Sequence, residues 1–157
     1  MRQRLGSRPV VLVAATLVVL VLGGCAPYTG TPTQKVHEWV SQNSFVSDND
    51  TLVNDVIRVR EAVKIGTVKQ VVTICGGFAS DVGTANTTLP TPDQVLTNEL
   101  NDADLLFIDA STACSGVSSV TSPVMKSSLA KLTAGLADLV KAQQRLRALG
   151  IDWNVRL

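Results

Sequence analysis

Three cysteines and one histidine are the residues of this 157-residue chain best suited to chemistry. His37 has no carboxylate or nucleophile placed beside it to form an acid–base pair, so we expect a surface residue rather than a catalytic one. Cys75 and Cys114 are too few for a zinc site, since His37 is the only histidine and lies outside the main predicted helices. They also lack the C-x-x-C spacing of a redox site. The sequence therefore predicts a protein that is not an enzyme and holds no metal or cofactor.

Four acidic residues fall within one predicted helix: Glu99, Asp102, Asp104 and Asp109. Carboxylate pairs can hydrolyse glycosides or bind calcium, but a calcium loop needs regularly spaced oxygen ligands and a glycine, which are absent here. We therefore expect a solvated helix face.

A glycine-rich stretch, ICGGFASDVG, spans residues 74–83. It lacks the Gly-Lys-Ser/Thr ending of a phosphate-binding loop. We expect Gly76 and Gly77 instead to allow close helix packing, although each weakens a helix by roughly 1 kcal/mol relative to alanine.

Residues 1–24 have the organisation of an export signal. Three arginines precede a run of apolar residues over 10–22, and no acid interrupts either part. The run is shorter than the roughly 20 residues that a membrane-spanning helix needs. Gly23 and Gly24 then permit close approach by a peptidase, immediately before Cys25.

The segment Leu22-Gly23-Gly24-Cys25 resembles the lipobox of bacterial lipoprotein precursors, which is a leucine, two small residues and the modified cysteine. The resemblance implies signal-peptidase recognition at Leu22, Gly23 and Gly24, cleavage before Cys25, and a diacylglycerol on the Cys25 thiol. Two or three acyl chains would hold the protein on the outer face of the bacterial cell membrane far better than one. The alternatives are an uncleaved membrane helix and an ordinary signal followed by a coincidental cysteine.

Charge and composition exclude some classes of binding partner. Without residues 1–24 the chain has 133 residues, with 11 basic and 13 acidic side chains, a formal charge of −2. No basic field attracts nucleic acid, and aromatic residues, at 4% of the whole chain, are too few for sugar-stacking or base-stacking surfaces. The sequence predicts no nucleic-acid partner and does not indicate an oligomeric state.

The elements that follow are predicted to be a tether and one all-α domain. Residues 25–49 mix Pro, Gly, Ser and Thr, so we expect a lipidated N-terminus and flexible tether, in which VHEWV could form a turn or two of helix. Residues 50–157 form the predicted domain, with apolar residues recurring every three or four positions.

Four helices account for that periodicity. The first begins at Asp50, and we expect Gly66 to interrupt or bend the run before a second apolar stripe from Val68 to Val82. Thr91-Pro92-Asp93-Gln94 predicts a capping box that opens the third helix, and Pro123 opens the last. Ile151 and Trp153 could fold back onto the bundle. Short connections between such helices predict a small antiparallel helical bundle.

Cys75 and Cys114 are predicted to form a disulfide. They are the even pair left once Cys25 is lipidated, both lie on apolar helix faces, and an exported protein meets oxidising conditions. A tight antiparallel hairpin would separate their heights by about 16 Å, whereas a disulfide needs Cα atoms within about 7 Å. A steep crossing, an early helix end or the absence of the bond would resolve this conflict, and we favour a crossing or a bent helix.

The domain is also loosely similar to small secreted helical domains of high-GC Gram-positive bacteria. These have a cysteine, a proline-rich turn and a second cysteine in this order, here Cys75, Leu89-Pro90-Thr91-Pro92-Asp93 and Cys114. The resemblance supports the helical fold and the cross-link, and implies no activity.

We therefore expect a non-catalytic envelope lipoprotein whose helical domain binds a protein or a wall component. The alternative is a carrier that holds a lipid or another apolar ligand inside the bundle. An enclosed apolar cavity above roughly 300 Å³ would favour the carrier.

Overall fold

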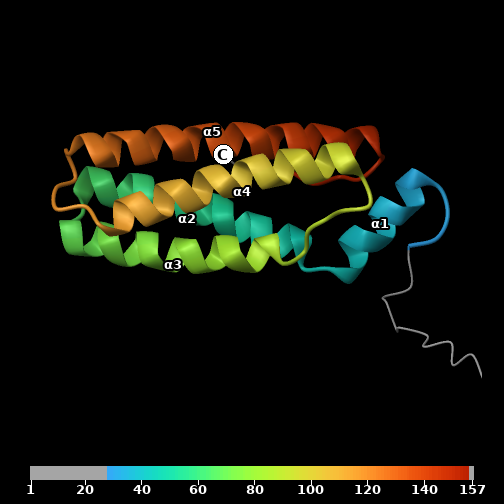
Figure 1. Cartoon of the computed structure of the whole chain (residues 1–157), viewed down its shortest axis with the longest axis horizontal. Coiled ribbons are helices and arrows are strands. Elements are labelled where there is room, and N and C mark those ends of the chain that lie inside the picture. The colour runs from blue at the N-terminus through green and yellow to red at the C-terminus, as the bar shows by residue number, and fades with distance from the viewer. Residues whose placement is uncertain (1–27, 156–157) are drawn as a thin grey trace, which may run out of the picture.

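Five α-helices and no strand make up residues 28–155, which are the part of the chain that this computed structural model describes (Figure 1). The predicted all-α antiparallel bundle is confirmed for these residues, and no helix among them is long and apolar enough to cross a bilayer. The signal segment, Leu22, Gly23, Gly24 and Cys25 lie outside the described residues. The helices are α1 (Pro32–Gln42), α2 (Phe45–Ile65), α3 (Val68–Asn86), α4 (Gln94–Ser115) and α5 (Pro123–Ala148).

The expected tether over residues 25–49 is wrong from Pro32 onward, because α1 and the first turn of α2 occupy that segment. Val36 and Trp39, one helical turn apart, are buried at the end of the bundle, and Phe45 is buried beside them. Trp39 Nε1 donates a hydrogen bond to the carbonyl of Thr88 at 3.0 Å. The sequence indicated only a turn or two of helix, over VHEWV, whereas α1 has 11 residues because tertiary packing stabilises it.

An aromatic cluster, which we call the end cap, closes this end of the bundle. It consists of Trp39, Phe45 and Trp153. The ring centroid of Phe45 lies 4.9 Å from that of Trp39 and 5.0 Å from that of Trp153. Trp153 Nε1 donates to Asp50 at 3.3 Å, and Gln143 Nε2 donates to the Trp153 carbonyl at 2.7 Å. The C-terminal segment therefore folds back onto the bundle, as the sequence suggested.

Helix α4 begins at Gln94 rather than at Pro92. Asp93 is its N-cap, and the Asp93 carboxylate accepts a hydrogen bond from the Leu96 amide at 2.8 Å. The Thr91 hydroxyl instead accepts from the Asp93 amide at 3.0 Å, so the predicted capping box does not form. The Asp93 carboxylate also accepts from Arg145 Nε at 3.0 Å, which ties the start of α4 to the end of α5.

The connection between α3 and α4 sets the register of this hairpin. Residues 87–93 carry the chain past the end of α3 before α4 begins, so α4 starts farther along the bundle axis (Figure 1). Phe78 on α3 therefore meets Phe107 on α4, with ring centroids 5.4 Å apart. The connection takes up the height difference that we expected a crossing or a bent helix to absorb.

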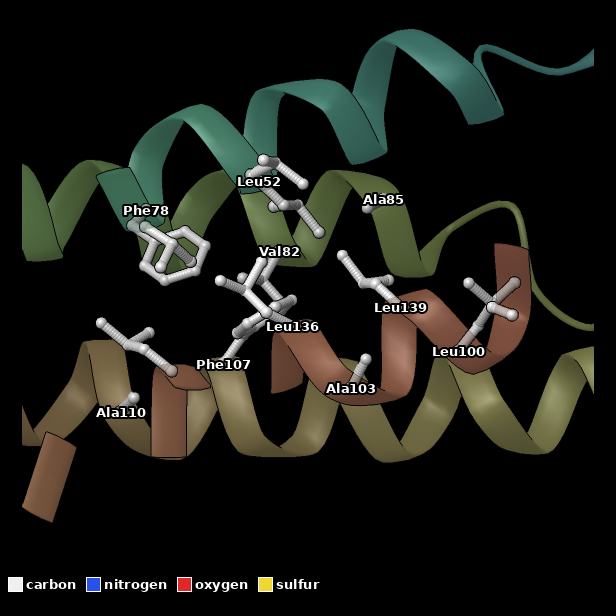
Figure 2. Packing of buried hydrophobic residues seen from close by; sticks show 14 of the residues in the cluster. Leu52, Phe78, Val82, Ala85, Leu100, Ala103, Phe107, Ala110, Leu136 and Leu139 are labelled. Atoms are coloured by element: carbon white, nitrogen blue, oxygen red, sulfur yellow. The ribbon is translucent and has the colours of Figure 1, made fainter. Parts of the chain in front are cut away.

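The core lies between α2, α3, α4 and α5. Figure 2 shows Phe78 and Val82 from α3 and Phe107 from α4 beside Leu136 and Leu139 from α5. The closest approach is at Gly135, where an added Cβ would lie 2.5 Å from the Phe107 ring. Glycine at this position lets the Phe107 ring lie against the backbone of α5.

Candidate functional site

The disulfide between Cys75 and Cys114 is present and joins α3 to α4. Their Cα atoms are 5.9 Å apart, and both residues are completely buried. A redox partner needs access to a sulfur atom, and neither cysteine is accessible from the surface. The bond therefore acts as a structural cross-link within the core.

His37 lies exposed on α1, as predicted. Within residues 28–155 no hydrogen bond or ion pair connects it to an acid or to a nucleophile. No cluster of three or more potential metal ligands occurs in that part of the chain either. The described residues thus assemble neither an acid–base pair around His37 nor a metal centre.

Asp104 corrects the expectation that the four acids on α4 share a solvated face. Asp102 and Asp109 are exposed, but Asp104 is only 5% exposed because it lies on the buried side of the helix with Ala103 and Phe107. Burial raises the pKa of Asp104 to about 7. Near neutral pH this carboxyl is therefore divided between its protonated and ionised forms.

Asp55 is a second buried acid, and its only signal in the sequence is its place next to the apolar Val56. One carboxylate oxygen accepts from Arg58 Nη1 at 2.9 Å, and the other is buried without a hydrogen-bond partner. Burial, with the facing carboxyl of Asp81 on α3, raises the pKa of Asp55 to about 6. Arg58 opposes this rise without cancelling it.

The glycines of α3 do not mediate helix packing. A Cβ added at Gly76, Gly77 or Gly83 would meet no atom within 4 Å, and all three residues are exposed. Close packing occurs instead at Gly135 of α5. The expectation for the glycine-rich stretch is therefore wrong, because the buried stripe of α3 is formed by Val71, Cys75, Phe78 and Val82.

A surface groove of about 470 Å³ runs between the C-terminal half of α2 and the N-terminal half of α3. Its apolar part includes Ile65, which is 89% exposed, the highest fraction for any large apolar side chain among the described residues. We call it the α2–α3 groove. Its lining residues are Arg58, Glu61, Ala62, Ile65, Gly66, Lys69, Gln70, Thr73 and Ile74.

A second groove, of about 320 Å³, lies between the end of α4 and the start of α5 and includes Ala113, Val124 and Lys131. Both grooves are open to solvent. The space between the helices is filled by side chains such as Phe78, Phe107 and Leu136 (Figure 2).

Charge is unevenly distributed along the bundle. Residues 56–80 and 106–134 form the end that holds the α2–α3 turn, and they carry six basic and two acidic side chains. We call this end the basic half. Residues 28–55, 81–105 and 135–155 form the end that holds α1, and they carry eleven acidic and four basic side chains. We call it the acidic half.

No protein-family model matches the chain, and neither the curated proteins nor the solved structures contain a match.

Proposed function

We propose that this protein is a non-catalytic lipoprotein of the bacterial envelope, anchored by acyl chains on Cys25, whose helical domain binds an envelope protein or a wall component. The observation that carries the proposal is the order of the N-terminal features: arginines, an apolar run, then Leu22-Gly23-Gly24-Cys25. The apolar run over residues 10–22 is shorter than the roughly 20 residues that a membrane-spanning helix needs, and is typical of an export signal.

The disulfide supports export. Cys75 and Cys114 are bonded in the core, and stable structural disulfides form in oxidising compartments rather than in most bacterial cytoplasms. A protein carried across the membrane by its signal segment would meet such a compartment.

A binding role is better supported than the carrier alternative. Carriers hold their ligands in concave apolar sites that bury most of the ligand surface. Here the interior is occupied by side chains such as Phe107 and Leu136, and the α2–α3 groove is open and has charged residues on its walls. An open groove of this kind suits a segment of a partner rather than a lipid that must be shielded from water.

Metabolic labelling tests the anchor. We expect the full precursor, expressed in a bacterium, to incorporate radiolabelled palmitate and to fractionate with membranes. The Cys25→Ser variant should incorporate none, and Cys75→Ser serves as the control cysteine variant that keeps the label. Mass spectrometry of the membrane-extracted protein should show an acylated N-terminus at Cys25, and an unmodified Met1 start or a free Cys25 thiol would refute the proposal.

A further inference from the structure

We propose that the α2–α3 groove is the docking site for an acidic, apolar-faced segment of a partner protein. The inference rests on the proposed binding role and adds the site and the chemistry of the partner. It does not depend on the lipid anchor.

The apolar side chains of the groove favour a partner with an apolar face. Ile65 is almost fully exposed at the end of α2, with Ala62 one turn before it and Ile74 on the facing side of α3. Scattered exposed apolar side chains are common, but here one lines a groove beside other apolar atoms. Covering an isoleucine side chain would strengthen binding about tenfold or more.

The charges around the groove select an acidic partner. Lys69 lies in the α3 wall of the groove, and the exposed Lys64 lies one residue before Ile65. Arg58 lies in the α2 wall, where its ion pair with Asp55 already compensates part of its charge. The whole basic half has an excess of four basic side chains. Charged surfaces of this kind speed the encounter with a partner of opposite sign and orient it.

A protein segment fits these walls better than a dense polyanion or an anionic membrane. Glu61 lies in the groove and repels any anion placed opposite it, so closely spaced phosphates fit poorly, whereas a protein segment can keep its acidic residues beside Lys69 and away from Glu61. The groove also lies in the half of the bundle away from α1, where the chain enters from its N-terminal segment (Figure 1).

The groove has the length of a short helix. Its residues on α2 extend from Arg58 to Ile65, which is about two helical turns, or roughly 10 Å. A partner helix of two to three turns could place apolar residues at spacings of three and four on Ile65 and Ile74, and acidic residues beside Lys69.

A synthetic peptide tests the chemistry. The protein would be the acylated mature chain in phosphatidylcholine nanodiscs, and the probe a fluorescent helical peptide of about 14 residues with leucines on one face and glutamates elsewhere. We expect this peptide to bind at least about tenfold more tightly than a peptide with lysines in place of the glutamates, and its binding to weaken with added salt.

Variants of exposed residues test the site. Ile65→Ser and Lys69→Glu should each weaken binding of the glutamate peptide about tenfold, while circular dichroism shows an unchanged helix content. The matched controls lie in the acidic half: Val95→Ser, at a half-exposed apolar residue of α4, and Lys35→Glu on α1 should leave binding unchanged.

The inference would be overturned by no binding of the glutamate peptide, by an equal loss of binding in the control variants, or by equally tight binding of the lysine peptide. If Ile65→Ser weakened binding of the protein to phosphatidylglycerol vesicles but left binding of the glutamate peptide unchanged, the groove would be assigned to a membrane instead. Repeating the titration with the unacylated Cys25→Ser chain in solution separates this inference from the anchor, because the groove should bind equally well without it.

Discussion

Aspartates of this bundle differ widely in their proton affinity because the fold gives each a different environment. Asp93 lies beside Arg145, and the hydrogen bond between them lowers the pKa of Asp93. Among residues 28–155 burial alone shifts Asp104, so its pKa rises to about 7. The stabilisation from ionised Asp93 is lost as the pH falls below about 4. The folded state holds the Asp104 proton more tightly than the unfolded chain does, and the stabilisation from that proton is lost as the pH rises toward 7. We expect stability to be greatest in mild acid.

Replacing Asp104 by asparagine tests this pH dependence. Between about pH 4 and pH 7 the folded state keeps a proton on Asp104 that the unfolded chain has released, so stability falls as the pH rises through that range. The loss for wild type should be on the order of 2–4 kcal/mol. Asp104→Asn cannot ionise and should lose less, as measured by urea unfolding at a series of pH values.

The control for this series is Asp109→Asn, on the same helix. Asp109 is exposed and makes a surface ion pair with Lys131 at 3.1 Å. Such pairs contribute about 0–1 kcal/mol, so its pH profile should follow that of wild type. Parallel profiles for Asp104→Asn and wild type would contradict the assignment of the pH dependence to Asp104.

At the scale of the helices, glycine has opposite roles on α3 and α5. Gly135→Ala would place a Cβ 2.5 Å from the Phe107 ring and should destabilise the protein by about 1–3 kcal/mol through overpacking. Gly76→Ala adds the same methyl group where no atom lies within 4 Å, and should stabilise the protein by about 0.5–1 kcal/mol. Thermal unfolding measures both, and changes of the same sign would contradict this account of the packing.

The helices were largely predictable because apolar residues at spacings of three and four are a local signal. The stripe through Leu52, Val56 and Val59 proved buried, as did the stripe through Cys75 and Val82. Helix α1 was predicted only as a turn or two over VHEWV, because Val36 and Trp39 alone mark its buried side. The register of α3 against α4 was missed because it depends on the path of residues 87–93, which no periodicity encodes.

The candidate site was less predictable than the fold. A groove arises from the relative positions of two helices, so Ile65 reads in the sequence as one more apolar residue of α2. The separation of charge into two halves has the same origin, since residues such as Lys64 and Lys126 lie far apart in sequence and share one end of the bundle only after folding. Asp104 appeared solvated because its acidic neighbours are.

At the scale of the whole molecule, the disulfide joins α3 to α4, and so links the α2–α3 hairpin to the α4–α5 hairpin. It links residues 39 positions apart, so its removal enlarges the unfolded ensemble, at a cost of roughly 4 kcal/mol on the chain-entropy model. The double variant Cys75→Ala/Cys114→Ala should unfold at correspondingly lower denaturant concentration. Intact mass should rise by about 2 Da when the wild type is unfolded and reduced, and no rise would show that the bond is absent.

The end cap has a spectroscopic consequence. The chain has two tryptophans, and both Trp39 and Trp153 lie in this one cluster, on either side of Phe45. Intrinsic emission therefore reports only on the junction of α1, α2 and the C-terminal segment, whereas far-ultraviolet ellipticity reports on all the helices. A fluorescence transition that precedes the ellipticity transition would reveal the undocking of both chain ends from a bundle that is still folded.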